Sequence, residues 1–83
     1  MFCQLLHRID PDQNMARYYR VEALSDLFGA VIVERRWGRI GSRGQFRQTT
    51  YASAPLAEVA ASKWIKVKER RGYRSPGPGG ASS

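Results

Sequence analysis

Residues 30–40 read AVIVERRWGRI, and this segment decides the predicted fold. Its β-branched run, Val31 to Val33, favours a strand over a helix. Alternation along a strand places five residues of changing character on one face: Val31, Val33, Arg35, Trp37 and Arg39. Because that face passes from apolar to basic, we predict a bulge or strong twist near residues 36–38, where Gly38 permits one.

Three further segments alternate in the same way and predict strands at residues 2–10, 17–24 and 45–52. They are separated by turn-forming stretches, DPDQN, SDLFG and GSRG. In the first strand the more apolar set is expected to face the core, namely Cys3, Leu5, His7 and Ile9. The strands follow one another through short connections, which favours an antiparallel sheet.

Residues 53–73, SAPLAEVAASKWIKVKERRGY, change to a helical period. Pro55 suits the first turn, and Gly72 is a natural stop. The expected core stripe is Leu56, Ala60, Trp64 and Val67, flanked by Val59, with Trp64 as the large ring of the core. We therefore predict an α+β fold, in which an antiparallel sheet of four or so strands carries one C-terminal helix on one face. Residues 1–74 form the domain, and residues 75–83 form a flexible Pro/Gly/Ser tail.

The positive charge of the chain is concentrated in its second half. The 83 residues carry a net charge of +7, but residues 1–34 sum to −2 and residues 35–74 sum to +9. Eleven of the fourteen basic residues are arginine, whose planar fork grips phosphate with two bonds and stacks on rings. This distribution indicates a polyanionic partner, such as nucleic acid.

Other functional classes find little support in the composition. One His and one Cys are too few for a zinc site of the usual kind, and no acid–base constellation is evident. We therefore predict no enzymatic activity, no cofactor and no small-molecule substrate. No apolar stretch reaches the length of a membrane span, and the start lacks the basic head of a secretory signal, so we expect a cytoplasmic protein without a membrane partner.

Trp37 stands inside the stretch RRWGRIGSRGQFR, residues 35–47, which holds five arginines and no acid. As a core residue, Trp37 would pack on the helix and its N–H would need a partner. As a contact residue, it would offer a flat face to a base or sugar, worth roughly 1–3 kcal/mol by analogy with single-strand stacking. Composition alone leaves both interpretations open.

The motif Trp37-Gly38-Arg39, with the flanking residues of Glu34 to Gly41, resembles the signature of the WGR domain. The paired-aromatic strand 17–21, RYYRV, and the lysine-bearing helix that ends in Gly72-Tyr73 extend the resemblance over residues 2–74. The chain looks like the stand-alone bacterial version of a domain found in DNA-dependent poly(ADP-ribose) polymerases. The resemblance implies a role in DNA repair, in which Trp37 stacks on a terminal nucleotide and Arg39 lies beside the backbone. The polymerase activity does not carry over, because the catalytic domain is absent from this sequence.

These observations lead to one main hypothesis, a nucleic-acid-binding module that recognises DNA ends, nicks or strand junctions, with DNA preferred over RNA. The predicted contact residues are Trp37, Gly38, Arg39, Arg35, Arg43 and Arg47, and the basic surface is extended by Lys63, Lys66 and Arg70. The alternative is a protein-interaction module, whose basic surface docks an acidic partner or a second copy of the chain.

Overall fold

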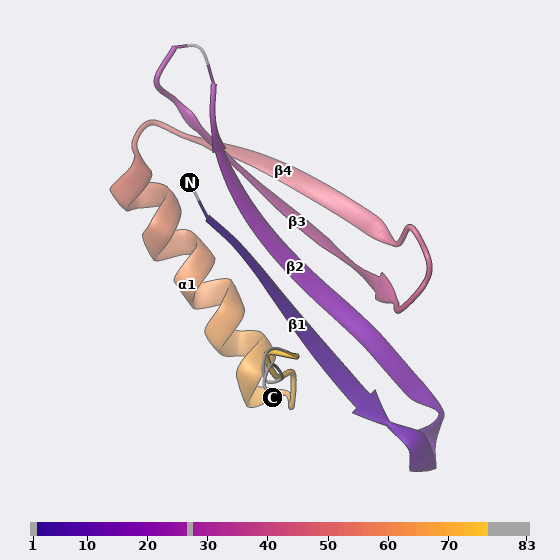
Figure 1. The fold of residues 1–83 in the computed structure, drawn as a ribbon. Coiled ribbons are helices and arrows are strands. Elements are labelled where there is room, and N and C mark those ends of the chain that lie inside the picture. Colours follow the sequence, from indigo (N-terminus) through magenta and orange to yellow (C-terminus); the bar gives the residue numbers. More distant parts are fainter. Residues whose placement is uncertain (1, 27, 77–83) are drawn as a thin grey trace.

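The computed structural model describes residues 2–26 and 28–76. Four strands, Phe2–Asp10 (β1), Met15–Ser25 (β2), Val31–Arg39 (β3) and Gln45–Tyr51 (β4), form one antiparallel sheet in the order β1-β2-β3-β4. The helix Ala54–Arg70 (α1) lies along one face of this sheet (Figure 1). The predicted α+β fold is therefore confirmed, and each strand begins and ends within two residues of its predicted place.

The pairing of β2 with β3 is continuous, from Arg17 opposite Arg39 to Ser25 opposite Val31. The predicted bulge near residues 36–38 is therefore wrong, since no extra residue interrupts either ladder of β3 within the described strands. The face of β3 that runs from Val31 to Arg39 passes from apolar to basic because its burial decreases along the strand. Val33 is buried in the core, whereas Arg39 at the far end of the same face is exposed.

The core lies between α1 and the face of the sheet that it covers, which we call the helix-side face. Its buried residues are Leu6, Tyr19, Val21, Ala23, Val31, Val33, Ala57, Ala61 and Tyr73. Leu6 of β1 belongs to this core, whereas Leu5 and Ile9 stay 38% and 62% exposed on the opposite, open face. The predicted inward set Cys3, Leu5, His7 and Ile9 is therefore wrong. Leu6 pairs with Tyr19, so the register of β2 decides which side of β1 faces the helix.

The helix meets the sheet through a different stripe from the predicted one. Ala57 and Ala61 are fully buried, and Trp64 and Ile65 are partly buried against the core. Leu56 and Val59, which the periodicity placed inside, are each 56% exposed, and Val67 is 42% exposed. The two alanines have small side chains, so the helix backbone can approach the sheet closely, and Leu56 and Val59 remain on its outer side.

Both ends of α1 are capped by side chain and backbone groups. The Ser53 hydroxyl accepts from the Leu56 amide, and Pro55 stands in the first turn as predicted. At the other end Gly72, with φ of 98°, lets the Tyr73 amide donate to the Lys68 carbonyl at 3.1 Å. This turn directs Tyr73 into the core and brings Arg74 beside β1, where it exchanges two 2.7 Å backbone hydrogen bonds with His7. The predicted tail boundary after residue 74 stays a prediction, because residues 77–83 lie outside the described residues.

At the β3–β4 connection, Gly38 and Gly44 lie in close contact with each other. The Tyr18 hydroxyl donates to the Arg43 carbonyl at 2.8 Å, which ties β2 to the loop. A side chain at Gly38 would place its Cβ 2.7 Å from the Gly44 Cα. One at Gly44 would overlap the Trp37 carbonyl and the Tyr18 hydroxyl. The motif that contains Trp37 therefore depends on this close backbone approach.

We expect Gly44→Ala to destabilise the domain by about 1–3 kcal/mol more than Gly41→Ala, because overpacking adds to the backbone strain. Both glycines have positive φ, 68° and 94°, but a Cβ at Gly41 meets nothing within 4 Å. Gly41→Ala is therefore the matched control for strain alone. Urea unfolding of the two variants measures the difference, and equal losses would contradict the packing argument.

Candidate nucleic-acid interface

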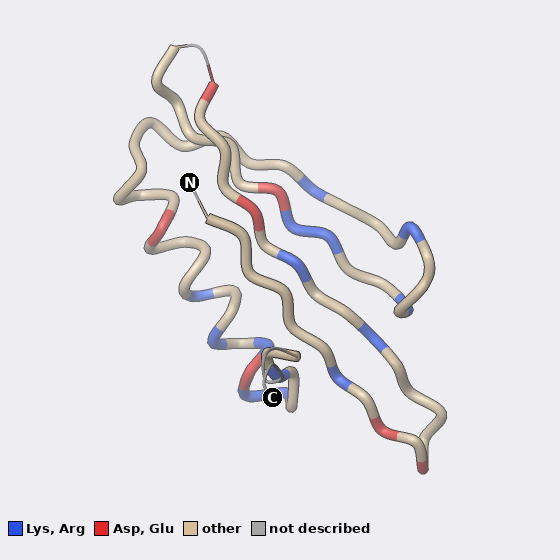
Figure 2. Tube along the Cα trace, viewed as in Figure 1, with Lys and Arg blue, Asp and Glu red and all other residues tan. Residues whose placement is uncertain are grey.

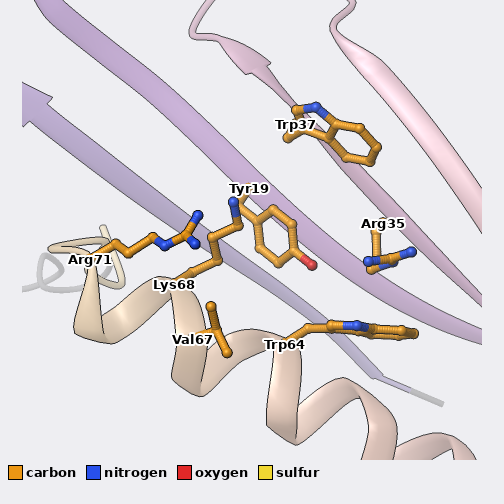
Figure 3. A pocket seen from close by; sticks show the side chains of 7 residues that line it. All are labelled: Tyr19, Arg35, Trp37, Trp64, Val67, Lys68 and Arg71. Atoms are coloured by element: carbon orange, nitrogen blue, oxygen red, sulfur yellow. The ribbon is translucent and has the colours of Figure 1, made fainter.

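Beyond the core, the helix-side face opens into a groove between the sheet and the C-terminal half of α1. The groove has two compartments. The inner compartment, of about 270 Å³, is lined by Tyr19, Arg35, Trp37, Trp64, Val67, Lys68 and Arg71 (Figure 3). The outer compartment, of about 380 Å³, is lined by Arg17, Trp37, Gly38, Arg39, Lys68 and Tyr73. Trp37 and Lys68 line both compartments, so the two compartments adjoin at these residues.

Trp37 is half-buried, and it packs against the core cluster while it also borders both compartments. Trp37 thus contributes to packing and also borders the groove, and its role as a contact residue stays a prediction. A ring in this setting is firmly held and still accessible to a ligand.

Arg35 is held in place by the second tryptophan. Its guanidinium carbon lies 4.0 Å from the centre of the Trp64 ring, and Figure 3 shows it between Trp37 and Trp64. The Trp64 ring in turn contacts Tyr51, with ring centroids 6.5 Å apart. The Arg35 Nε atom is buried and has no hydrogen-bond partner among the described residues. The stacking fixes the plane of the guanidinium but leaves part of its hydrogen-bonding capacity unused.

Lys68 projects from α1 over a floor of two tyrosines. Its Nζ lies 5.0 Å from the centre of the Tyr19 ring and 5.4 Å from that of Tyr73. Burial lowers the pKa of the Lys68 ammonium, and the charges of Arg71, Arg17 and Arg35 lower it further. Burial also raises the pKa of the Tyr19 hydroxyl, although the charge of Arg35 partly offsets this. Tyr19 is therefore neutral at pH 7 and adds no negative charge to the groove.

The helix-side face carries three cross-strand pairs of arginines. Arg17 stands opposite Arg8 on one side and Arg39 on the other, and Arg35 stands opposite Arg47. Like charges directly opposite one another destabilise a sheet. Within residues 2–26 and 28–76, no carboxylate forms an ion pair with any of these five arginines. The repulsion on this face is therefore not relieved by the described residues.

The open face shows the contrasting arrangement. Arg20 stands opposite Arg36, but each has an acidic partner two residues away on its own strand. Arg20 pairs with Glu22 at 2.9 Å, and Arg36 pairs with Glu34 at 3.4 Å. These are the two ion pairs of the described part of the chain, and both lie on this face. On the sheet, the ion-paired arginines thus lie on the open face, whereas the arginines of the helix-side face have no acidic partner among the described residues. Figure 2 shows basic residues on the strands and along the C-terminal half of the helix.

The structure brings some of the predicted contact residues together and separates others. Arg35, Trp37, Gly38 and Arg39 line the groove. Arg47 is exposed beside Arg35, and Arg43 is exposed in the β3–β4 loop. The helix residues lie apart from the groove: Lys63 and Lys66 border a separate depression on the outer side of α1, and Arg70 is exposed without lining the groove.

Several groove residues were missed by the sequence reasoning, namely Arg17, Tyr19, Lys68, Arg71 and Tyr73. A signal for some of them exists. Arg17 and Tyr19 share one parity of their strand. Lys68 and Arg71 follow Ala57, Ala61 and Trp64 at helical spacing. If the stripe of Ala57, Ala61 and Trp64 had been taken as the inner face of the helix, Lys68 and Arg71 would have been predicted to lie against the sheet.

The described residues form neither a candidate metal site nor a helix that could span a membrane. No three His, Cys, Asp or Glu side chains gather there in a way that could hold a metal ion. Among the same residues, no helix combines the length and the apolar character needed to cross a membrane.

Because the folded state releases the Lys68 proton below the ordinary lysine pKa of 10.5, its charge destabilises the fold at neutral pH. This penalty should disappear as pH rises from the lowered pKa toward about 10.4, since the unfolded chain keeps the proton there. We therefore expect the free energy of unfolding of the wild type to rise relative to that of Lys68→Met over this window. Lys63→Met, on the outer side of the same helix, is the control. Parallel pH profiles for wild type and Lys68→Met would contradict the crowding of charge around Lys68.

Comparison with known proteins shows the family to which the chain belongs. The model of the WGR domain matches residues 2–79. The uncharacterized protein y4dW of Sinorhizobium fredii is 38% identical over 69 residues, which cover 83% of this chain and 34% of that protein. The chain thus spans about a third of the length of this relative. No solved structure matches the chain.

Proposed function

Because the chain belongs to the WGR domain family, we propose that it is a non-enzymatic module that binds DNA ends, nicks or strand junctions. In proteins like the poly(ADP-ribose) polymerases the WGR domain is a nucleic-acid-binding module, and it is not a catalytic domain. The observation that carries the proposal is the groove. It combines Arg17, Arg35 and Arg39, which form no ion pair, with the half-buried Trp37, and no acidic residue lines it in the part of the chain that the structure describes.

In this proposal the arginines hold phosphates and Trp37 reads the end of a strand. Arg17 and Arg39 border the outer compartment together, and Arg39 already donates to the Asn14 carbonyl at 3.3 Å, which orients it. A guanidinium has further N–H groups for a phosphate oxygen. Phosphate contacts are available on any duplex, whereas stacking needs a base or sugar exposed at an end or nick. The same groove therefore provides both affinity and selectivity.

The number of phosphates neutralised sets the salt dependence of binding. If three to five groove cations each neutralise one phosphate, log K should fall with log salt at a slope of about −3 to −4. The double variant Lys63→Gln, Lys66→Gln on the outer side of α1 should leave this slope unchanged. A flattening by about two units in that variant would show that the contacts extend around the helix, as the sequence suggested. A wild-type slope near zero would contradict phosphate binding altogether.

Trp37 and Arg39 should fail in different ways. Trp37→Leu keeps apolar packing against the core but removes the flat ring, so we expect a stability loss below about 2 kcal/mol and the loss of most preference for nicked over intact duplex. Arg39→Ala removes one phosphate contact, so it should weaken both duplexes alike and flatten the salt slope by about one unit. The measurement is a paired titration of one duplex sequence with and without a nick, accompanied by unfolding curves.

The outcome for the folded Trp37→Leu variant decides the stacking role. If it still prefers the nicked duplex, Trp37 does not read the end. If wild type binds neither duplex, the nucleic-acid proposal fails as a whole.

A second candidate, protein docking, is favoured by the outer side of α1. Leu56 and Val59 are both exposed there, and Val59 borders the same depression as Lys63 and Lys66. A mixed apolar and basic surface suits an acidic protein partner better than a duplex. This surface is separate from the groove, so both candidates can hold for one protein.

A further inference from the structure

We propose that the inner compartment is a second phosphate site, which takes the nucleotide strand as it continues past the end read by Trp37. The ligand class is a single-stranded extension, such as the overhang of a duplex end. This inference rests on the proposed function, because it assumes that the outer compartment holds the terminal nucleotide. It goes further by assigning a separate role to the inner compartment.

The charges of the inner compartment converge from both layers of the fold. Arg35 comes from β3, Lys68 from the last turn of α1 and Arg71 from the residue that caps the helix (Figure 3). No carboxylate lines this compartment within the described residues, although the charges of Arg71 and Arg35 already disfavour the Lys68 ammonium. A bound phosphate would relieve this repulsion for all three cations at once.

The aromatic walls of the compartment suit a sugar or base next to that phosphate. Trp64 and Tyr19 line it together with Trp37, and Arg35 lies flat over the Trp64 ring at 4.0 Å. Nucleotide strands are held by cations that track the backbone and by rings that cover the bases. The stacked guanidinium is already ordered, so it loses little freedom when it contacts a phosphate.

The size and continuity of the compartment select a single strand over a duplex. Its volume of about 270 Å³ lies near the lower end of small-ligand pockets, roughly 300–1,000 Å³, and is far too small for a duplex. Trp37 and Lys68 line both compartments and form the boundary between them. A strand that stacks on Trp37 can therefore pass Lys68 and reach Arg71 without leaving the groove.

Arg71 provides the sharpest test, because it lines the inner compartment but not the outer one, and it is exposed at the end of α1. Wild type should bind a duplex with a short single-stranded overhang several-fold more tightly than the same duplex with a blunt end. Arg71→Gln should remove this advantage, because it weakens overhang binding several-fold more than blunt-end binding, and it should flatten the salt slope for the overhang by about 0.7. Arg70→Gln, the adjacent exposed arginine outside the groove, is the matched control and should retain the advantage.

The titrations use overhangs of both polarities at one salt concentration, with unfolding curves for each variant. An advantage for either polarity, lost in Arg71→Gln and kept in Arg70→Gln, supports the second phosphate site. The inference is overturned if wild type binds blunt and overhang duplexes equally, or if Arg71→Gln weakens both equally. Either of those results leaves the proposed function standing, whereas the absence of binding to every duplex would remove both.

Discussion

The antiparallel register of β2 and β3 determines which side chains meet on each face of the sheet, and the groove depends on it. Tyr19 stands opposite Trp37, and Tyr18 stands opposite Gly38. A slip of one residue along either strand would exchange its two faces. In β3, such a slip would turn Trp37 toward the open face and bring Glu34 into the groove. The Tyr18 hydroxyl, bonded to the Arg43 carbonyl, and the tight contact between Gly38 and Gly44 both oppose such a slip. The glycines of the motif thus serve the site by fixing the register.

Much of the fold could be predicted from the sequence, because alternation and turn residues are local properties. The β-branched run from Val31 to Val33, Pro55 in the first helical turn and Gly72 at the helix end act within a few residues of themselves. Errors arose where the deciding partner was distant in sequence. Both faces of β1 carry apolar residues, so only its pairing with β2 could select Leu6. On the helix, aliphatic size suggested Leu56 and Val59, whereas close packing on the sheet required alanine.

The same distinction applies to the site. Arg35, Trp37 and Arg39 are consecutive members of one strand face, so a linear pattern was enough to propose them together. Arg17 joins them only through strand pairing, and Lys68 only through the rotation of the helix about its axis. No composition or motif argument contains that information. Lys63, Lys66 and Arg70 show the converse case, since their charge suggested contact residues but the helix turns them away from the groove, so their role as contacts stays a prediction.

The unpaired arginines have an energetic consequence that differs between the free and bound states. A like-charged cross-strand pair costs roughly 0.2–1 kcal/mol, and solvent screening puts exposed pairs near the lower end. A hydrogen bond to a charged group contributes about 1.5–3 kcal/mol, so one phosphate contact outweighs the repulsion of one pair. The fold therefore tolerates the arrangement when free and gains from it when an anion binds. On the open face, Glu22 and Glu34 already provide that relief internally, which leaves no comparable gain for an external anion.

The two tryptophans divide the work of the groove, and neither is simply a core residue. A free arginine side chain carries about 2 kcal/mol of rotamer entropy, which binding would otherwise have to remove. The Trp64 ring restricts Arg35 before any ligand arrives, and such a stacked cation is worth about 0.5–2 kcal/mol depending on its exposure. The two magnitudes are comparable, so the stacking contact can offset most of the ordering cost within the free domain. Trp64 thereby prepares a cation, while Trp37, two residues along β3 from that cation, offers the ring that a nucleotide can meet.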